Sequence, residues 1–175
     1  MQLFYTIMVE MRKNSILELI RFVFSVAAIT FILMRFVLLP CVVQGDSMYP
    51  FLHDGDYGFS FIISRNVSIN RFEVAVIKVK DSKLLVKRVI GLPGEEISYI
   101  DNRLYVNGNY VEEPFLKEDV STSDFTIKLS DDEYFCMGDN RNISRDSRYY
   151  GPFHEDIILS THLLVIYPFG DFGFK

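Results

Sequence analysis

Two residues of this chain, Ser47 and Lys87, have types and settings that suit nucleophilic catalysis. Ser47 lies in a Gly-Asp-Ser-Met-Tyr-Pro segment at 45–50, and Lys87 lies in a Leu-Val-Lys-Arg-Val-Ile-Gly segment at 85–91. A serine hydroxyl is a weak nucleophile until a neighbouring base takes its proton. The sequence therefore suggests a serine nucleophile that is activated by a lysine amine.

Lys87 can act as a base only if its amine is neutral. The ordinary pKa of a lysine is about 10.4, and burial among apolar groups lowers this pKa because the charged form loses its water. On a strand, Lys87 would share one face with Leu85 and Val89 while Arg88 points to the other face. That setting favours a neutral amine, although a charged lysine at the surface is the commoner arrangement.

The three histidines, His53, His154 and His162, are alternative bases. Histidine is the side chain whose ordinary pKa lies nearest neutrality, so a Ser-His-Asp triad stays open at this point. None of the three stands in a local motif, however. The carboxylates of Asp46 and Asp139 are weak bases toward a hydroxyl and would serve to orient other groups.

A third polar segment follows an apolar strand that is predicted at 133–137. Residues 138–148 read Gly-Asp-Asn-Arg-Asn-Ile-Ser-Arg-Asp-Ser-Arg. The simplest interpretation is a solvated loop tied together by Asp-Arg pairs. Its density of hydrogen-bonding groups directly after a buried strand also suits a loop that positions a functional site.

An apolar run from residue 16 to residue 39 precedes Ser47, and only Glu18, Arg21 and Arg35 interrupt it. A membrane-spanning helix needs about 20 such residues, and the two arginines would lie near its ends, where their charges reach water. We expect Pro40 to end this helix. A cleaved signal peptide and a buried core helix are alternatives, but the run is long and apolar for either.

The charges around the apolar run predict its orientation. Arg12, Lys13 and Arg21 flank its N-terminal end, whereas no Lys or Arg occurs between Arg35 and Arg65. The positive-inside rule then places the N-terminus in the cytoplasm. We predict a short cytoplasmic segment (1–15), a single-pass anchor in the cell membrane (16–39) and an extracytoplasmic domain (40–175).

The region after the anchor has the pattern of a mainly β domain. Strands are predicted at 72–79, 84–90, 97–100, 104–106, 110–111, 125–129, 133–137 and 163–167. Turn signals such as Asn107-Gly108 separate several of them, and residues 97–137 are predicted to form a small meander. The expected fold is a compact antiparallel sandwich or barrel-like body.

Composition excludes several classes of function. The net charge is −5 and no basic block stands out, so nucleic acid is not predicted as a partner. The two cysteines, Cys41 and Cys136, belong to no metal-binding spacing. We therefore predict no metal and no cofactor, and the position of Cys41 beside the membrane argues against a disulfide.

Taken together, the three segments resemble the boxes of the type I signal peptidases, the membrane-bound Ser-Lys leader peptidases of bacteria (peptidase family S26), in their Gram-positive form. Residues 45–52 look like the nucleophile box, and residues 87–95 look like the base box. Residues 138–152 look like the third box, and Tyr167-Pro168 fits the closing strand. All occur in family order from the anchor onward, and their combination is far more specific than any one alone.

The resemblance implies a role for each site residue. Ser47 would attack the scissile carbonyl, Lys87 would be the general base, and Ser144 would orient the Lys87 amine. Asp146, Arg148 and Arg88 are implied to support the site through ion pairs. The oxyanion would be bound by the Ser47 N–H. Gly45 stands where some relatives carry a serine, so it brings no hydroxyl to the oxyanion region.

The same resemblance implies the substrates, which are preproteins that carry signal peptides with small residues before the cut. Membrane lipid is the other expected partner. Pocket positions that match the family are Cys41, Val43, Met48, Leu52, Leu85 and Val86. The chain departs from the family at Phe51, where a small Thr is usual, and at Ile143, where a polar residue is common.

Two other functions share parts of this pattern. Some signal-peptidase-like proteins act as accessory factors in pilus or surface-protein assembly, and they can lack the Ser-Lys pair that this chain keeps. Self-cleaving Ser-Lys repressors have a related β-fold but need an N-terminal DNA-binding helix-turn-helix. The apolar anchor occupies that place here.

Overall fold

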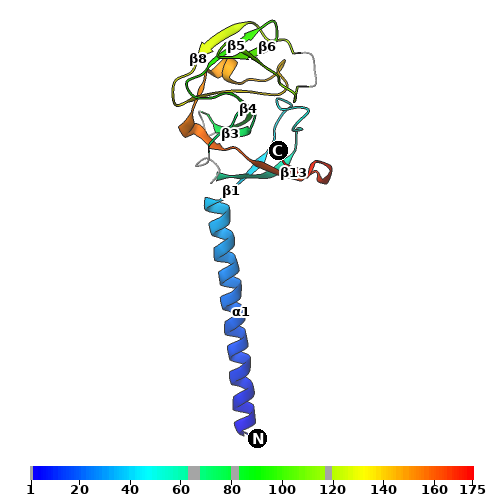
Figure 1. Ribbon diagram of the computed structural model, residues 1–175. Coiled ribbons are helices and arrows are strands. Elements are labelled where there is room, and N and C mark those ends of the chain that lie inside the picture. The colour runs from blue at the N-terminus through cyan, green and yellow to red at the C-terminus, as the bar shows by residue number, and fades with distance from the viewer. Residues whose placement is uncertain (1, 63–67, 80–82, 117–119) are drawn as a thin grey trace. The chain divides into compact units, whose positions relative to one another are not determined.

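The computed structural model describes residues 2–62, 68–79, 83–116 and 120–175 (Figure 1). The chain divides into two compact units, residues 1–38 and residues 39–175.

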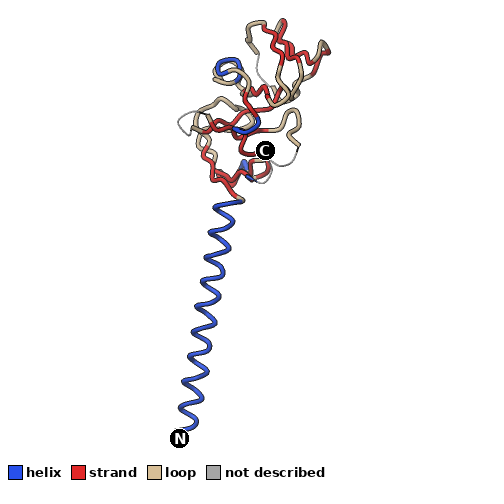
Figure 2. The backbone as a smooth tube through the Cα atoms, turned by 90° about the vertical axis from the view of Figure 1, so that its left-hand side faces the viewer, coloured by secondary structure: helices blue, strands red, loops and turns tan. Residues whose placement is uncertain are grey.

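The first unit is one long helix, α1 (Gln2–Phe36), coloured blue in Figure 2. Its stretch Ser15–Leu33 has 19 residues with a mean hydropathy of 2.2, which is long and apolar enough to cross a membrane. Large apolar side chains such as Phe22 and Phe24 are exposed. A helix that exposes apolar side chains in this way needs lipid or a partner around it.

The helix begins at Gln2, because no Gly or Pro interrupts the sequence from Gln2 to Phe36, and it thus includes residues that precede the predicted membrane-spanning run at 16–39. It also ends before Pro40, since the chain has already entered strand β1 (Leu38–Val42) there. Pro40 is therefore a strand residue and not the helix stop, and β1 lies at the edge of its sheet, where a missing N–H is tolerated.

The second unit is built from three antiparallel sheets (Figure 1). The first has the order β1-β2-β12-β13, in which β2 is Tyr57–Phe61, β12 is Leu163–Tyr167 and β13 is Gly173–Phe174. The second has the order β10-β9-β4-β3-β11, with β10 at Phe153–His154, β9 at Glu133–Met137, β4 at Leu84–Gly91, β3 at Val74–Lys78 and β11 at Ile158–Ser160. The third has the order β7-β6-β5-β8, with β7 at Asn109–Val111, β6 at Arg103–Val106, β5 at Glu96–Ile100 and β8 at Phe125–Lys128.

Three short helices complete the described elements: α2 (Ser147–Tyr150), η3 (Glu155–Ile157) and η4 (Phe169–Asp171). The predicted class, a mainly β domain after one apolar helix, is confirmed. The meander is smaller than predicted, because β9 pairs with β4 in the second sheet and not with the strands of the third. The tight turn at Asn107-Gly108 has positive φ at both residues, as a two-residue hairpin turn requires.

Strand β4 lies in the middle of the second sheet and has buried residues on both faces. Ala75 of β3 is the partner of Lys87, and Val76 is the partner of Val86. Val86 packs against the apolar cluster that contains Val74, Val76, Met48 and Leu52, whereas Leu85 and Val89 belong to a second cluster with Ala75 and Cys136. Alternation along β4 thus puts Lys87 on the face of Leu85 and Val89, as expected.

Gly58 is a point at which the first sheet leaves no room for a side chain. It pairs with Val165 of β12, and a Cβ atom there would clash with the Leu164 carbonyl, coming within 2.9 Å of its carbon. Because backbone atoms cannot move aside cheaply, we predict that Gly58→Ala lowers the free energy of unfolding by about 1–3 kcal/mol. Thermal unfolding of the full chain in detergent measures this.

Gly170 provides the matched control for that substitution. A Cβ atom there meets nothing within 4 Å, and its φ is not positive. Gly170→Ala should therefore leave the unfolding midpoint nearly unchanged. Equal losses in the two variants would show that the contact at Leu164 is not what constrains Gly58.

Candidate active site

Ser47 and Lys87 form one hydrogen-bonded pair. The Lys87 Nζ atom donates to Ser47 Oγ over 2.7 Å. Lys87 is only 3% exposed, although it is a lysine, and Ser47 is partly buried at the surface of a cleft. If the amine loses one proton, the same contact lets Ser47 donate its hydroxyl proton to nitrogen, which is the geometry that a general base needs.

Burial also sets the protonation of this amine. It lowers the pKa of Lys87 from 10.5 to about 8, while the carboxylates of Asp146 and Asp139 oppose the change by attracting a positive charge. The ammonium of Lys83 adds to the lowering. A substantial fraction of Lys87 is therefore neutral near physiological pH, which is the condition for a lysine base.

The loop after β9 holds the backbone of Ser47. The Asn140 N–H donates to the Ser47 carbonyl over 3.1 Å. Gly138 allows this close approach, because a Cβ atom there would collide with both the Ser47 carbonyl oxygen and Ser144 Oγ. Gly138 also donates its N–H to Asp146 Oδ2 over 3.0 Å, so the loop is fastened on both sides of the nucleophile.

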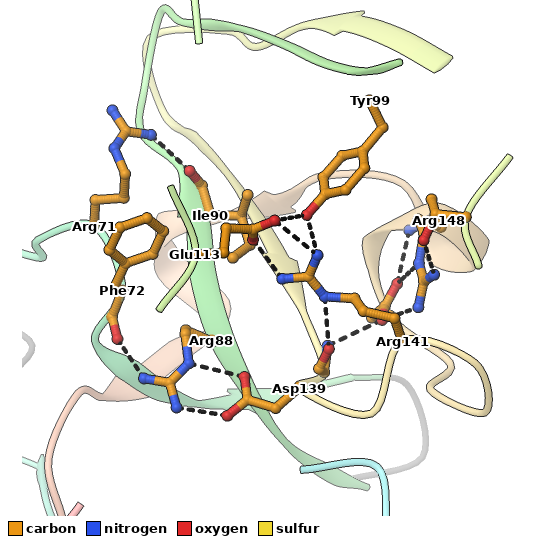
Figure 3. A network of polar contacts seen from close by, with 12 residues as sticks. Arg71, Phe72, Arg88, Ile90, Tyr99, Glu113, Asp139, Arg141 and Arg148 are labelled. Carbon is orange, nitrogen blue, oxygen red and sulfur yellow. Dashed lines mark hydrogen bonds and ion pairs between the residues drawn. The ribbon is translucent and has the colours of Figure 1, made fainter. Parts of the chain in front are cut away.

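The two carboxylates that act on Lys87, Asp139 and Asp146, are each paired with an arginine, and Figure 3 shows the Arg88–Asp139 pair. Arg88 donates to both carboxylate oxygens of Asp139, over 2.8 and 2.6 Å. Its guanidinium also lies over the Phe51 ring, 4.4 Å from the centroid. Arg148 donates from Nε and Nη2 to Asp146, over 2.9 and 2.8 Å. Both pairs are bidentate, the geometry that fixes position as well as charge.

Asp146 stays ionised in this setting. Burial alone would raise its pKa, but the Arg148 guanidinium and the Gly138 N–H hold the pKa below its ordinary value. Asp146 is fully buried and also caps α2 by accepting the Arg148 N–H. The carboxylate therefore organises the loop rather than acting as an acid or a base.

A second buried arginine, Arg141, was not predicted as a site residue. It donates to Glu113 Oε1 over 2.5 Å and to the Gly138 carbonyl over 3.0 Å. Its guanidinium also contacts the Tyr99 hydroxyl, and that hydroxyl donates to Glu113. Burial raises the pKa of Tyr99, so this hydroxyl keeps its proton. Figure 3 shows that Arg141 joins the third sheet to the loop that holds Ser47.

Ser144 lies on the loop that contacts Ser47, and its Oγ atom is buried. Its hydroxyl contributes to the lowered pKa of Asp146. The Oγ atom lies against Gly138. The role of Ser144 in holding Lys87 stays a prediction.

The predicted oxyanion region includes Gly45, which precedes Ser47 by two residues. Gly45 has a φ of 76°, which favours glycine, and its N–H donates to Asp54 Oδ1 over 2.7 Å. The Gly45 N–H is thus already used within the loop. The Ser47 N–H remains the expected donor to a developing oxyanion.

The cleft beside Ser47 has a volume of about 530 Å³. Five of the six predicted pocket residues line it: Cys41, Val43, Met48, Leu85 and Val86. Leu52 does not, because its side chain is fully buried in the apolar cluster of Met48 and Val76. The sequence analysis did not predict several other lining residues, among them the polar Gln44, Lys83, Arg145 and Tyr150, whereas Ile143, noted as a departure, is also in the lining.

The histidines have other neighbours. His53 faces Asp171, with 3.8 Å between Nδ1 and Oδ2. His154 contacts Asp132 and Asp156, and His162 contacts Thr161. Within the described part of the chain no histidine is hydrogen-bonded to Ser47, so the geometry does not support a Ser-His-Asp triad. Both cysteines are buried and free.

Comparison with known proteins identifies the family. The family model described as signal peptidase, peptidase S26, matches residues 16–167. The chain belongs to the signal peptidase family. It is 36% identical over 173 residues to signal peptidase I S of Bacillus subtilis, covering 91% of this chain and 94% of that one. It is 31% identical over 180 residues to signal peptidase IB of Staphylococcus aureus, covering 90% and 94%.

A solved structure of a signal peptidase I from Enterococcus faecalis agrees with the fold. It matches with a TM-score of 0.50 at 31% identity, covering 54% of this chain and 96% of that one. The three sequence segments thus occur in a chain that belongs to the signal peptidase family and whose fold is similar to that of a solved signal peptidase I.

The Arg141–Glu113 pair provides a test of what holds the site loop. Both side chains are almost fully buried, and removing one partner of a buried pair leaves the other charge uncompensated. We predict that Glu113→Gln lowers the free energy of unfolding by about 3 kcal/mol or more. Urea unfolding of the full chain in detergent measures this.

Glu112 is the control for Glu113. It is the adjacent residue and its side chain is exposed, so Glu112→Gln should change stability by less than about 0.5 kcal/mol. A Glu113→Gln variant as stable as Glu112→Gln would mean that Arg141 does not depend on this carboxylate.

Proposed function

We propose that this protein is a membrane-anchored serine endopeptidase that removes signal peptides from secreted preproteins, with Ser47 as nucleophile and Lys87 as general base. The single observation that carries the mechanism is the 2.7 Å contact between Lys87 Nζ and Ser47 Oγ, made by an amine buried enough to be neutral in part. Membership of the signal peptidase family supports the substrate class.

The chemistry follows from that pair. Neutral Lys87 takes the proton of Ser47 as Oγ attacks the scissile carbonyl, and the Ser47 N–H stabilises the oxygen that becomes negative. The Lys87 ammonium then donates its proton to the amine of the leaving chain, which breaks the peptide bond and leaves an acyl-enzyme. Water attacks the ester, Lys87 takes a proton from that water and returns it to Ser47 Oγ, and the free carboxylate departs.

The strand edges beside the cleft suit an extended peptide. Pairing of β4 with β9 begins at Arg88, so in the described sheet the Leu84–Lys87 part of β4 is paired with β3 on one side. On the other side of the cleft lies β1, an edge strand. A substrate strand would hydrogen-bond to these edges, and its small side chains would fill the space lined by Val43, Met48 and Val86.

The proposed location is the outer side of the cell membrane, with α1 as a single-pass anchor and lipid around Ser15–Leu33. Basic residues before this stretch favour a cytoplasmic N-terminus. A non-catalytic accessory role in surface-protein assembly is the alternative. It is not favoured, because an accessory factor has no need for a buried amine aligned on a serine hydroxyl.

Removal of either member of the pair should abolish cleavage. We predict that Ser47→Ala and Lys87→Met each reduce processing of a preprotein in detergent by at least about 10³-fold, because neither leaves a nucleophile with a base. Gel analysis of precursor and mature product measures this. The Lys78→Ala variant, at an exposed position of β3, should process normally, and unchanged unfolding midpoints show that the folds are intact. Processing at the normal rate by Ser47→Ala would rule out the mechanism.

The pH dependence should follow the protonation of Lys87. Since only the neutral amine is a base and its pKa is about 8, kcat/KM should fall about tenfold per pH unit below 8 and level off above it. The charge of Lys83 helps to lower this pKa, so Lys83→Ala should move the midpoint of the profile to higher pH, whereas Lys78→Ala should not. A rate that rises as the pH falls below 6 would contradict Lys87 as the base.

A further inference from the structure

A cluster of three possible metal ligands lies outside the proposed catalytic pair. His53 and Asp56 come from the turn that follows the nucleophile segment, and Asp171 comes from η4 near the C-terminus. One ligand atom from each residue lies within 4.8 Å of the others. The His53 Nδ1 and Asp171 Oδ2 atoms are 3.8 Å apart.

Asp56 provides a second observation at this cluster, because it is a buried carboxylate with one oxygen that no described protein group contacts. This residue is only 2% exposed, and its Oδ2 accepts the His53 N–H over 2.9 Å. Its Oδ1 atom is buried and has no hydrogen-bond partner among the residues that the structure describes. A buried carboxylate oxygen without a partner is costly, and a cation held by the cluster would remove that cost.

We propose that His53, Asp56 and Asp171 form a binding site for a divalent transition-metal ion of the zinc class. An imidazole nitrogen with two carboxylate oxygens is a donor set that zinc accepts, with water as a fourth ligand. Zinc ligands bonded at 2.0–2.2 Å lie roughly 3.4 Å from one another. The side chains of His53 and Asp171 are 45% and 34% exposed, so both have room to move. They can approach an ion that is coordinated by the buried Asp56.

Such an ion would connect the C-terminal turn to the segment that leads into Ser47. The turn at 53–56 already holds that segment, because the Val43 N–H donates to the Asp56 carbonyl over 2.8 Å and the Gly55 N–H donates to the Val43 carbonyl over 3.0 Å. Asp171 belongs to the last described turn before β13. The site would therefore stabilise the folded domain and fix its C-terminal segment, without taking part in the Ser47 reaction.

The chain contains a second histidine between two carboxylates, which provides a matched control. His154 contacts Asp132 through Nε2 and Asp156 through Nδ1. Because these contacts lie on opposite edges of the imidazole ring, the three groups cannot converge on one ion. His154→Gln should therefore leave zinc affinity unchanged.

The experiment is calorimetric titration of ZnCl₂ into the untagged full chain in detergent, after treatment with a chelator. We expect one saturable zinc site, and a rise in the unfolding midpoint as zinc is added, because an ion that binds the folded state stabilises it. His53→Ala and Asp171→Asn should each weaken zinc binding by at least roughly tenfold, since loss of an outer-shell partner alone costs that much. Both substitutions are at exposed or half-exposed side chains and spare the buried Asp56.

The outcomes separate the possibilities clearly. Absence of saturable zinc binding, or equal binding by His53→Ala and the unsubstituted chain, overturns the proposal and leaves a simple His53–Asp171 ion pair. Loss of the site in His154→Gln but not in Asp171→Asn also overturns it. The zinc titration does not depend on whether Ser47 and Lys87 cleave a preprotein. Failure of the metal site can therefore be distinguished from failure of the peptidase proposal.

Discussion

The site depends on keeping one amine both buried and close to carboxylates. Lys87 must be desolvated for its pKa to fall to about 8, yet Asp146 and Asp139 nearby pull that pKa upward. Each of these carboxylates is buried and bonded to its own arginine, Arg148 or Arg88. The pairing leaves little net negative charge to stabilise an ammonium. The two ion pairs therefore allow a loop that is rich in carboxylates to lie beside an amine that is partly neutral.

The same loop explains why the ion pairs are buried rather than solvated. Gly138 lies against the Ser47 carbonyl and Ser144, so its own backbone N–H and carbonyl need hydrogen-bond partners within the protein. Asp146 accepts hydrogen bonds from the Gly138 N–H and from Arg148. Arg141 donates a hydrogen bond to the Gly138 carbonyl. Burying paired charges seldom adds stability by itself. Their role here is to hold the loop in one conformation.

The sequence predicted those features of the site that depend on local residue patterns. Alternation along a strand was enough to put Lys87 among apolar side chains, because side-chain direction in a strand has a period of two. It could not find Glu113 or Tyr99, since their contacts with Arg141 join segments far apart in the chain. Leu52 was placed in the pocket from its position in a motif, but packing against Met48 turned it into the core. Helix α1 extends beyond the predicted membrane-spanning run at its N-terminal end, because hydropathy marks the apolar stretch and not the full length of a helix.

In the described sheet the Leu84–Lys87 part of β4 is paired on one side only. This open edge matters both for the proposed substrate binding and for association between copies of the protein. A strand with unpaired N–H and C=O groups invites any extended chain, including another copy of the protein. Here the Leu84–Lys87 stretch lies in a cleft, and the cleft wall carries the cationic side chains of Lys83 and Arg145. Charges at the rim of an edge discourage pairing with like copies, because each copy would bring the same cations to the contact. A preprotein strand without those cations is not repelled, so the rim can exclude self-association while the edge stays free for substrate.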